Sequence, residues 1–242
     1  MQTASLKNDW REITDALGQR FEISFNSYKP FACGIVIHPA IDACAQLRAQ
    51  GIAPEQVERI ELKVHSLVLE LTGKKEPVDG LQAKFSVYHG CAAGLTFGQA
   101  GEPEFADEVV RRADMVALRR KVVATVDDTI DEASADVTAV LTDGRRVHVF
   151  IGHAIGSLQK PMSDAQLDAK FHGLADPVLG AAATARRSGV DPSGEPRGRE
   201  AGHRGGGRHT CWPMTTSAAP ARIPREIWVL IAAAFVIAIG FG

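Results

Sequence analysis

Cysteines are few and far apart in this sequence, which limits the sites that they could form. The four, Cys33, Cys44, Cys91 and Cys211, include no CxxC pair, so their spacing indicates neither a zinc site nor a redox-active dithiol, and reduced thiols are expected. An excess of basic charge is also missing. The formal net charge is -2, so no global field favours nucleic acid, and any anion site must be local.

A secretory signal is a further absence, because the opening MQTASLKNDW has no basic segment followed by an apolar run.

Composition divides the chain into three parts. Residues 1–179 carry regular apolar patterns and predict one folded α+β domain. Residues 180–213 are rich in Gly and Arg and nearly lack aliphatic side chains, which predicts a disordered linker. Residues 214–242 end in an apolar run.

That apolar run, IWVLIAAAFVIAIGFG, contains no charged residue. A spanning helix needs roughly 20 apolar residues, so the run is slightly short, but its aliphatic and aromatic content favours insertion. We therefore expect a single transmembrane helix over residues 227–242, which would anchor a cytoplasmic domain of residues 1–179. Arg222 and Arg225 precede the helix and would lie on its cytoplasmic side.

Alternating apolar residues predict two strands early in the domain. One is RFEISFNSY, with Phe21, Ile23 and Phe25 on one face, and the other is VERIELKVHS. Between them, Pro39 opens a helix that Gly51 ends.

Three later segments complete the predicted domain. FSVYHGCAAGLTFG is a helix whose small residues at 90–94 allow close approach of a partner. ADVTAVLTDGRRVHVFIG is a β-hairpin with a tight Asp143-Gly144 turn, which favours positive φ at Asp143. SDAQLDAKFHGLA is a helix with Ser163 as N-cap, ending near Gly173. The expected fold is therefore α+β, a small antiparallel sheet with helices.

Lys29 and His38 stand at the two ends of the apolar segment SYKPFACGIVIHPAID. Lys29 follows a predicted strand and precedes Pro30, so its ammonium could project into a cleft and bind an anionic substrate. A surface lysine is the simpler interpretation. His38 stands at the edge of a predicted helix, where backbone N–H groups favour anions, but a structural histidine explains it equally well.

Tyr88 and His89 form a third candidate. They place a proton donor and a proton acceptor beside Gly90, which keeps the backbone accessible. Spacing alone does not separate this interpretation from two ordinary core residues.

Three segments together resemble the MmgE/PrpD family, which includes 2-methylcitrate dehydratases, cis-aconitate decarboxylases and related epimerases. They are YKPFACGIVIHPAIDA, ELTGKKEPVDGLQAKFSVYHGCAAGL and PMSDAQLDAKFHGLA. The resemblance covers about residues 15–179 and corresponds to the smaller α+β lid domain of family members. It implies that a large helical domain, from the same or another chain, would supply the other half of the active site.

The resemblance also implies roles for the four candidates. Lys29 would bind or polarise a carboxylate of a small polycarboxylate substrate, and His38 would orient the segment at the substrate site. His89 occupies the Tyr/His position of the FSxxY/H motif, with Tyr88 one position earlier, so this pair would transfer protons. The decarboxylases of the family have a Tyr at this position, whereas this chain has His89, so the resemblance does not assign decarboxylation in particular.

No cofactor or metal is implied by the family pattern, and the histidines of this chain are isolated along the sequence. Family members commonly dimerise, and the small residues at 90–94 could form either a subunit interface or a contact between domains. The substrate, the reaction and the oligomeric state are not determined by these residues.

A second interpretation keeps a non-catalytic class open. From Met214 the sequence resembles the start of a membrane transporter, a short polar leader followed by a first membrane helix. A frameshift after about Leu179 into a neighbouring gene would produce this arrangement. The chain would then be a truncated, lid-like remnant fused to a membrane segment.

Overall fold

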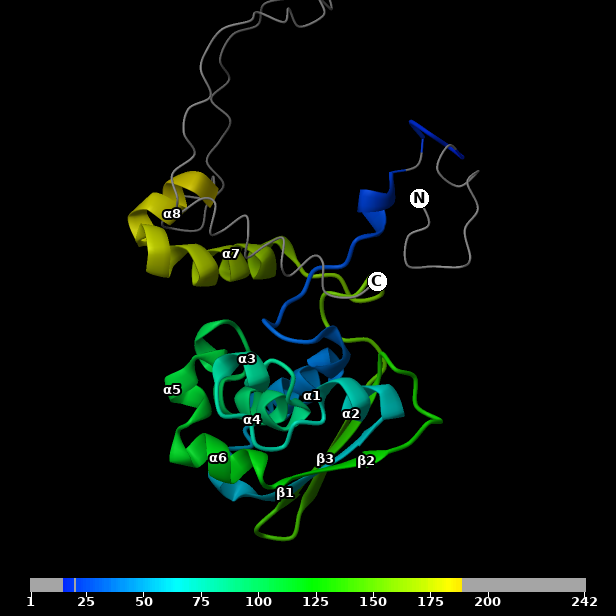
Figure 1. The fold of residues 1–242 in the computed structure, drawn as a ribbon, viewed down its shortest axis with the longest axis vertical. Coiled ribbons are helices and arrows are strands. Elements are labelled where there is room, and N and C mark those ends of the chain that lie inside the picture. The colour runs from blue at the N-terminus through cyan, green and yellow to red at the C-terminus, as the bar shows by residue number, and fades with distance from the viewer. Residues whose placement is uncertain (1–14, 20, 189–242) are drawn as a thin grey trace, which may run out of the picture. The chain divides into compact units, whose positions relative to one another are not determined.

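The computed structural model describes residues 15–19 and 21–188, and Figure 1 shows helices gathered on one side of a twisted sheet. In chain order the elements are η2 (Glu22–Phe25), η3 (Ile35–Ile37), α1 (His38–Ala49), η4 (Pro54–Gln56), β1 (Val57–Val64), α2 (Ser66–Thr72), α3 (Gly80–Ala83), α4 (Val87–Phe97), η5 (Pro103–Phe105), α5 (Asp107–Val110), α6 (Ala113–Arg119), β2 (Val122–Val126), β3 (Ala135–Leu141), β4 (Arg146–Ile151), α7 (Asp164–Leu179) and α8 (Ala181–Ser188).

The sheet has the strand order β2-β1-β3-β4. β1 pairs antiparallel with β3 and parallel with β2, and β3 pairs antiparallel with β4. The expected small sheet is confirmed, but it is mixed and not antiparallel, because the β1–β2 pair is parallel. The chain between β1 and β2 contains α2 to α6, and a connection of that length can return to the starting edge, as a parallel pair requires.

β1 confirms the predicted strand, and one of its two faces is buried while the other faces solvent. Ile60, Leu62 and Val64 are buried, whereas Glu61 lies on the opposite, solvent-facing side, where Arg146 of β4 pairs with it. Helix α1 covers the buried side against β3 and β4. Burial of this apolar stripe supplies most of the stabilisation of the sheet.

The predicted helix at Pro39 is confirmed as α1, and Gly51 follows its end with a φ of 87°. Helix α4 packs against α1 through the small residues that the sequence singled out. A Cβ at Gly94 would lie 2.7 Å from the Ile41 carbonyl oxygen, and one at Gly90 would lie 3.1 Å from the Ile41 side chain. Since Gly90 and Gly94 are buried inside the domain, a dimer interface must use another surface.

The β-hairpin is confirmed, with a turn different from the expected one. The Gly144 N–H donates to the Leu141 carbonyl and the Leu141 N–H donates to the Arg145 carbonyl. Gly144 has a φ of 85°, while Asp143 is not among the described residues with positive φ. The turn thus uses three residues with glycine in the left-handed position, a common hairpin solution. The Asp143 carboxylate accepts from the Arg145 N–H.

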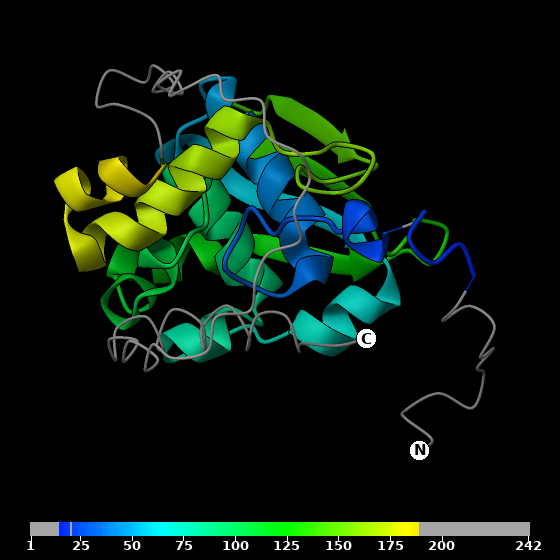
Figure 2. The same cartoon turned by 90° about the horizontal axis from the view of Figure 1, so that it is seen from above.

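Helix α7 begins as predicted and ends later. Ser163 caps it, and its hydroxyl and the Gln166 side chain form a capping box. The helix continues through Gly173, which makes the expected end there wrong, and α8 follows at residues expected to belong to the disordered linker. Figure 2 shows α7 and α8 side by side, and they pack together. Contact with a second helix compensates for a glycine whose intrinsic helix propensity is low.

The strand predicted over residues 20–28 is wrong in its described part, residues 21–28. Residues 22–25 form the 3-10 helix η2, and the Phe21 and Ile23 side chains are 61% and 77% exposed. An alternating pattern becomes a strand only where another strand pairs with it, and no described strand lies beside this segment.

Two further expectations concern residues at the end of the chain. The linker beyond residue 188 and the transmembrane helix at 227–242 lie outside the described residues. Across residues 15–19 and 21–188, no helix has the length and apolar character needed to cross a membrane.

Candidate functional site

Lys29 lies in an irregular segment whose backbone is fixed on one side by the loop that follows β4. The Tyr28 N–H donates to the Gly156 carbonyl at 3.0 Å. Gly156 has a φ of 89°, and a Cβ there would lie 2.1 Å from the Tyr28 carbonyl oxygen and 2.7 Å from Pro30. Only glycine permits this approach, so the loop sets the backbone position of Lys29.

The same segment is held by two other elements. The Lys170 Nζ, from α7, donates to the Lys29 carbonyl oxygen. The Ala32 N–H donates to the Ala100 carbonyl at 2.9 Å. These bonds connect a loop to elements far away in the sequence, and they leave the Lys29 side chain to face outward from a defined backbone.

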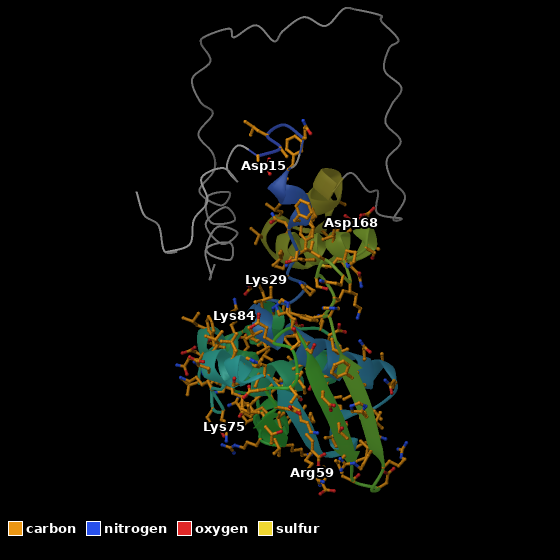
Figure 3. The ribbon with its side chains drawn as sticks, turned by 90° about the vertical axis from the view of Figure 1, so that its right-hand side faces the viewer. Asp15, Lys29, Arg59, Lys75, Lys84 and Asp168 are labelled. Carbon is orange, nitrogen blue, oxygen red and sulfur yellow. The ribbon has the colours of Figure 1, made fainter. Side chains whose placement is uncertain are left out.

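The Lys29 ammonium is partly exposed and has no acceptor among the described residues. Two other lysines lie near it: Lys29 and Lys84 both act electrostatically on the Cys33 thiol, and Lys29 acts on Lys170. Figure 3 shows Lys29 and Lys84 between the helix that carries Asp168 and the sheet, with Arg59 at the far end of the sheet. The lysines therefore make a local basic site on a chain of negative net charge.

His38 is the first residue of α1 and is 3% exposed. Its ring packs edge-on against Phe31 at 5.3 Å between centroids and hydrogen bonds the Cys33 backbone. Burial, together with the nearby Lys29 and Lys170 ammoniums, lowers the pKa of His38 to about 4. His38 is therefore neutral near pH 7 and packs beneath the Lys29 segment.

Tyr88 lies in the first turn of α4, which the Ser86 hydroxyl caps by accepting from the His89 N–H. The Tyr88 side chain is 5% exposed, and burial raises its pKa. The Lys75 Nζ lies 5.9 Å from the ring centroid, within the range of a cation–π contact.

His89 is fully buried and faces η5. Its Nε2 lies 3.0 Å from the Glu104 carbonyl oxygen, and its ring lies 5.5 Å from that of Phe105. A carbonyl can only accept, so Nε2 carries the proton and Nδ1, which has no partner among the described residues, keeps a lone pair. Burial lowers the pKa of His89, so the ring is neutral.

The structure thus brings Lys29 and His38 together and gives Tyr88 and His89 other neighbours. No hydrogen bond or ring contact in the described part of the chain joins the two pairs. The loop that carries Glu102 and Glu104 contacts both Lys84 and His89, since Glu102 pairs with Lys84 at 2.7 Å and the Glu104 carbonyl accepts from His89.

Lys84, Glu102 and Lys170 were not identified from the sequence. A weak signal was present, because Lys84 and Lys170 each stand in an Ala-Lys-Phe tripeptide within segments that carry the family resemblance. The tripeptide alone does not show that the two lysines meet.

A cleft of about 520 Å³ opens beside this site, between the Tyr28 segment, the start of α1 and the loop after β4. Its lining is mainly apolar, with His38 in one wall and with Asp131 and Glu132 also present. Two carboxylates disfavour an anion, so the lysines outside the cleft make the better anion site. Within the described residues, no three His, Cys, Asp or Glu side chains are grouped so that they could hold a metal ion.

Comparison with known proteins identifies the family of this domain. Residues 31–191 match the family described as the MmgE/PrpD C-terminal domain, a match that runs beyond the domain end expected at 179. Two relatives are 2-methylcitrate dehydratases, from Salmonella typhimurium (strain LT2) and Salmonella typhi. Each is 26% identical over 149 residues, which cover 55% of this chain and 30% of the relative. The chain therefore matches less than a third of the length of these relatives.

Proposed function

The chain belongs to the MmgE/PrpD family through its C-terminal domain, a family of lyase type, and from this premise we propose that it acts on a small polycarboxylate such as 2-methylcitrate or cis-aconitate. The reaction would be dehydration or decarboxylation. Because the match covers only 30% of the length of the relatives, the proposal includes a helical domain, in the same or another chain, that completes the site.

One observation carries the proposal. The Lys29 ammonium has no acceptor among the described residues, although its backbone is held on both sides by Gly156 and Lys170. An ammonium near a carboxylate gains about four times more Coulomb energy at an effective dielectric constant near 20 than in water. A substrate carboxylate that becomes partly desolvated at Lys29 would therefore be bound and polarised there.

Exposed apolar side chains near Lys84 support partial desolvation. Ile35 and Phe85 are 54% and 42% exposed. Ile35 and Phe85 lie on either side of the bond between the Gly34 N–H and the Lys84 carbonyl. Exposed apolar side chains close to charged groups are typical of a surface that another domain or subunit covers. The helical domain is the partner that we propose for it, and self-association remains the alternative.

The other candidates take different roles in this proposal. His38, neutral and packed against Phe31, would support the Lys29 segment from below. Tyr88 and His89 would serve proton transfer at the start of α4. His89 reaches a substrate only if the η5 segment moves, because its Nε2 donates to Glu104.

The test begins with binding by the full chain. We expect tricarballylate to bind the unaltered chain and to bind the Lys29→Ala variant more weakly. Titration monitored by NMR or calorimetry measures both affinities. Lys74→Ala is the matched control, since Lys74 is exposed and its side chain makes no hydrogen bond or ion pair with the other described residues. Equal affinity of the two variants contradicts the assigned role of Lys29.

Turnover separates the enzyme from the non-catalytic remnant. The chain is mixed with the helical portion of the Salmonella typhimurium relative, and 2-methylcitrate dehydration is followed by the absorbance of the unsaturated product. We expect Lys29→Ala to cost about 2 to 5 kcal/mol, the range for truncating one partner of a buried charge pair. That corresponds to roughly 30-fold to several thousandfold in kcat/KM. No turnover with any polycarboxylate, in a mixture shown to associate, supports the remnant.

A further inference from the structure

Lys170 occupies an unusual position for a helix lysine. It belongs to α7, and instead of extending into solvent its side chain reaches the carbonyl oxygen of Lys29, 141 positions earlier in the chain. The side chain is partly buried. An ammonium has three donors, so the bond to Lys29 leaves two of them without a described acceptor.

The charges around Lys170 do not balance. Lys29, Lys84 and Lys170 contribute three positive charges, and Glu102 is the carboxylate that pairs with Lys84 and acts on Lys170. Glu102 is already paired with Lys84, at 2.7 Å and 3.0 Å from its two oxygens. The ammoniums of Lys29 and Lys170 therefore make no ion pair with a described residue, and the single charge of Glu102 does not balance all three lysines.

The electrostatic effects agree with this count. Burial lowers the pKa of Lys170, Glu102 opposes the decrease, and the nearby Lys29 ammonium adds to it. Lys170 and Lys29 are therefore close enough to repel each other. Repulsion between like charges held in place by the fold is relieved when an anion with matching charge binds between them.

We infer that Lys170 is a second anion-binding residue of the Lys29 site, so that the site takes ligands with at least two carboxylates in preference to monocarboxylates. The inference rests on the proposed function of Lys29. It assigns one carboxylate to each free ammonium, and it gives α7 a part in ligand binding that the sequence did not indicate.

A purely structural role for Lys170 is the competing explanation, because its bond to Lys29 O could serve only to dock α7. The two explanations differ in how they depend on charge. Lys170→Gln keeps an N–H donor and removes the charge, whereas Lys170→Arg keeps both. Lys74→Gln is the control for removing a lysine charge elsewhere.

The experiment titrates the full chain and its variants with tricarballylate and, separately, with propionate, and follows binding by NMR. We expect Lys170→Gln to bind tricarballylate at least tenfold more weakly than the unaltered chain, with propionate affinity within twofold and an unchanged melting temperature. Lys170→Arg should restore most of the tricarballylate affinity, and Lys29→Gln should weaken both ligands. Should Lys170→Gln not fold, Lys170→Met, which keeps the apolar stem, replaces it.

Each other outcome overturns the inference in a recognisable way. If Lys170→Gln and Lys74→Gln bind tricarballylate equally while Lys29→Gln binds it weakly, Lys170 is not a binding residue and the proposed function stands. If Lys170→Gln lowers the melting temperature and weakens both ligands equally, its role is structural. If the unaltered chain binds neither ligand, the inference and the assigned role of Lys29 fail together.

Discussion

Gly94 of α4 lies directly against the backbone of Ile41 in α1, where a Cβ would come within 2.7 Å of the Ile41 carbonyl oxygen. No side-chain rotation can relieve a collision with backbone. We therefore expect Gly94→Ala to destabilise the chain by about 1 to 3 kcal/mol, the usual range for overpacking a core, as measured by urea denaturation.

Gly173 provides the matched control, because it lies inside α7 with no atom within 4 Å of the Cβ position. Gly173→Ala should leave stability unchanged or raise it by up to about 1 kcal/mol through helix propensity. Loss of stability in Gly173→Ala equal to that in Gly94→Ala would show that the α1–α4 contact is not the cause.

The β3–β4 turn depends on Gly144 for its conformation. With a φ of 85° at Gly144, Gly144→Ala should cost about 1 to 2 kcal/mol because a Cβ crowds the backbone in the left-handed region. Gly152→Ala, close after β4, meets only ordinary contact at 3.7 Å from Phe150 and does not have positive φ, so its melting temperature should fall less. Equal melting temperatures for the two variants would mean that the turn is assigned incorrectly.

Buried His38 makes stability depend on pH. Its pKa is about 4 in the folded chain against an ordinary value of 6.5, so the unfolded chain takes up its proton first on acidification. Stability from the neutral ring is therefore complete above pH 6.5 and decreases as pH falls toward 4, by about 3 kcal/mol in total. His89, whose pKa burial also lowers, contributes with the same sign.

Urea denaturation between pH 7.5 and pH 4 measures this dependence. His38→Gln should unfold at lower urea near neutral pH and lose less stability on acidification than the unaltered chain. His148→Gln is the control, because the His148 side chain is 55% exposed, and its variant should keep the full pH dependence. A slope unchanged by His38→Gln would exclude His38 as its source.

Three buried cysteines should resist alkylation in the folded chain. Cys33, Cys44 and Cys91 are free and buried. Burial raises the pKa of Cys33, and a hydrogen bond with Cys91 together with burial raises that of Cys44 well above its usual value. The thiolate is the reactive form, so iodoacetamide at pH 8 should modify these thiols slowly until urea is added. Peptide mass spectrometry separates them from Cys211, and rapid modification of Cys44 without urea would contradict its burial.

Local sequence determined those elements whose signals lie within a few residues. Pro39 and Gly51 bracket α1, the alternation in VERIELKVHS becomes β1, and Ser163 caps α7. Each signal acts through a backbone angle, a cap or a repeated apolar face, which are properties of neighbouring residues. The position of Lys29 just before Pro30 could be noted for the same reason, although its role could not.

Tertiary structure decided the rest. Phe21, Ile23 and Phe25 alternate as a strand would, but a strand needs a partner, and the fold gives this segment none among the described strands. Lys29, Lys84 and Lys170 are far apart in the sequence. They form one basic site only because α7 and the segment before α4 both hydrogen bond the loop that contains Lys29. Electrostatic energy depends on distances in space, and those distances are set by packing between elements far apart in the sequence.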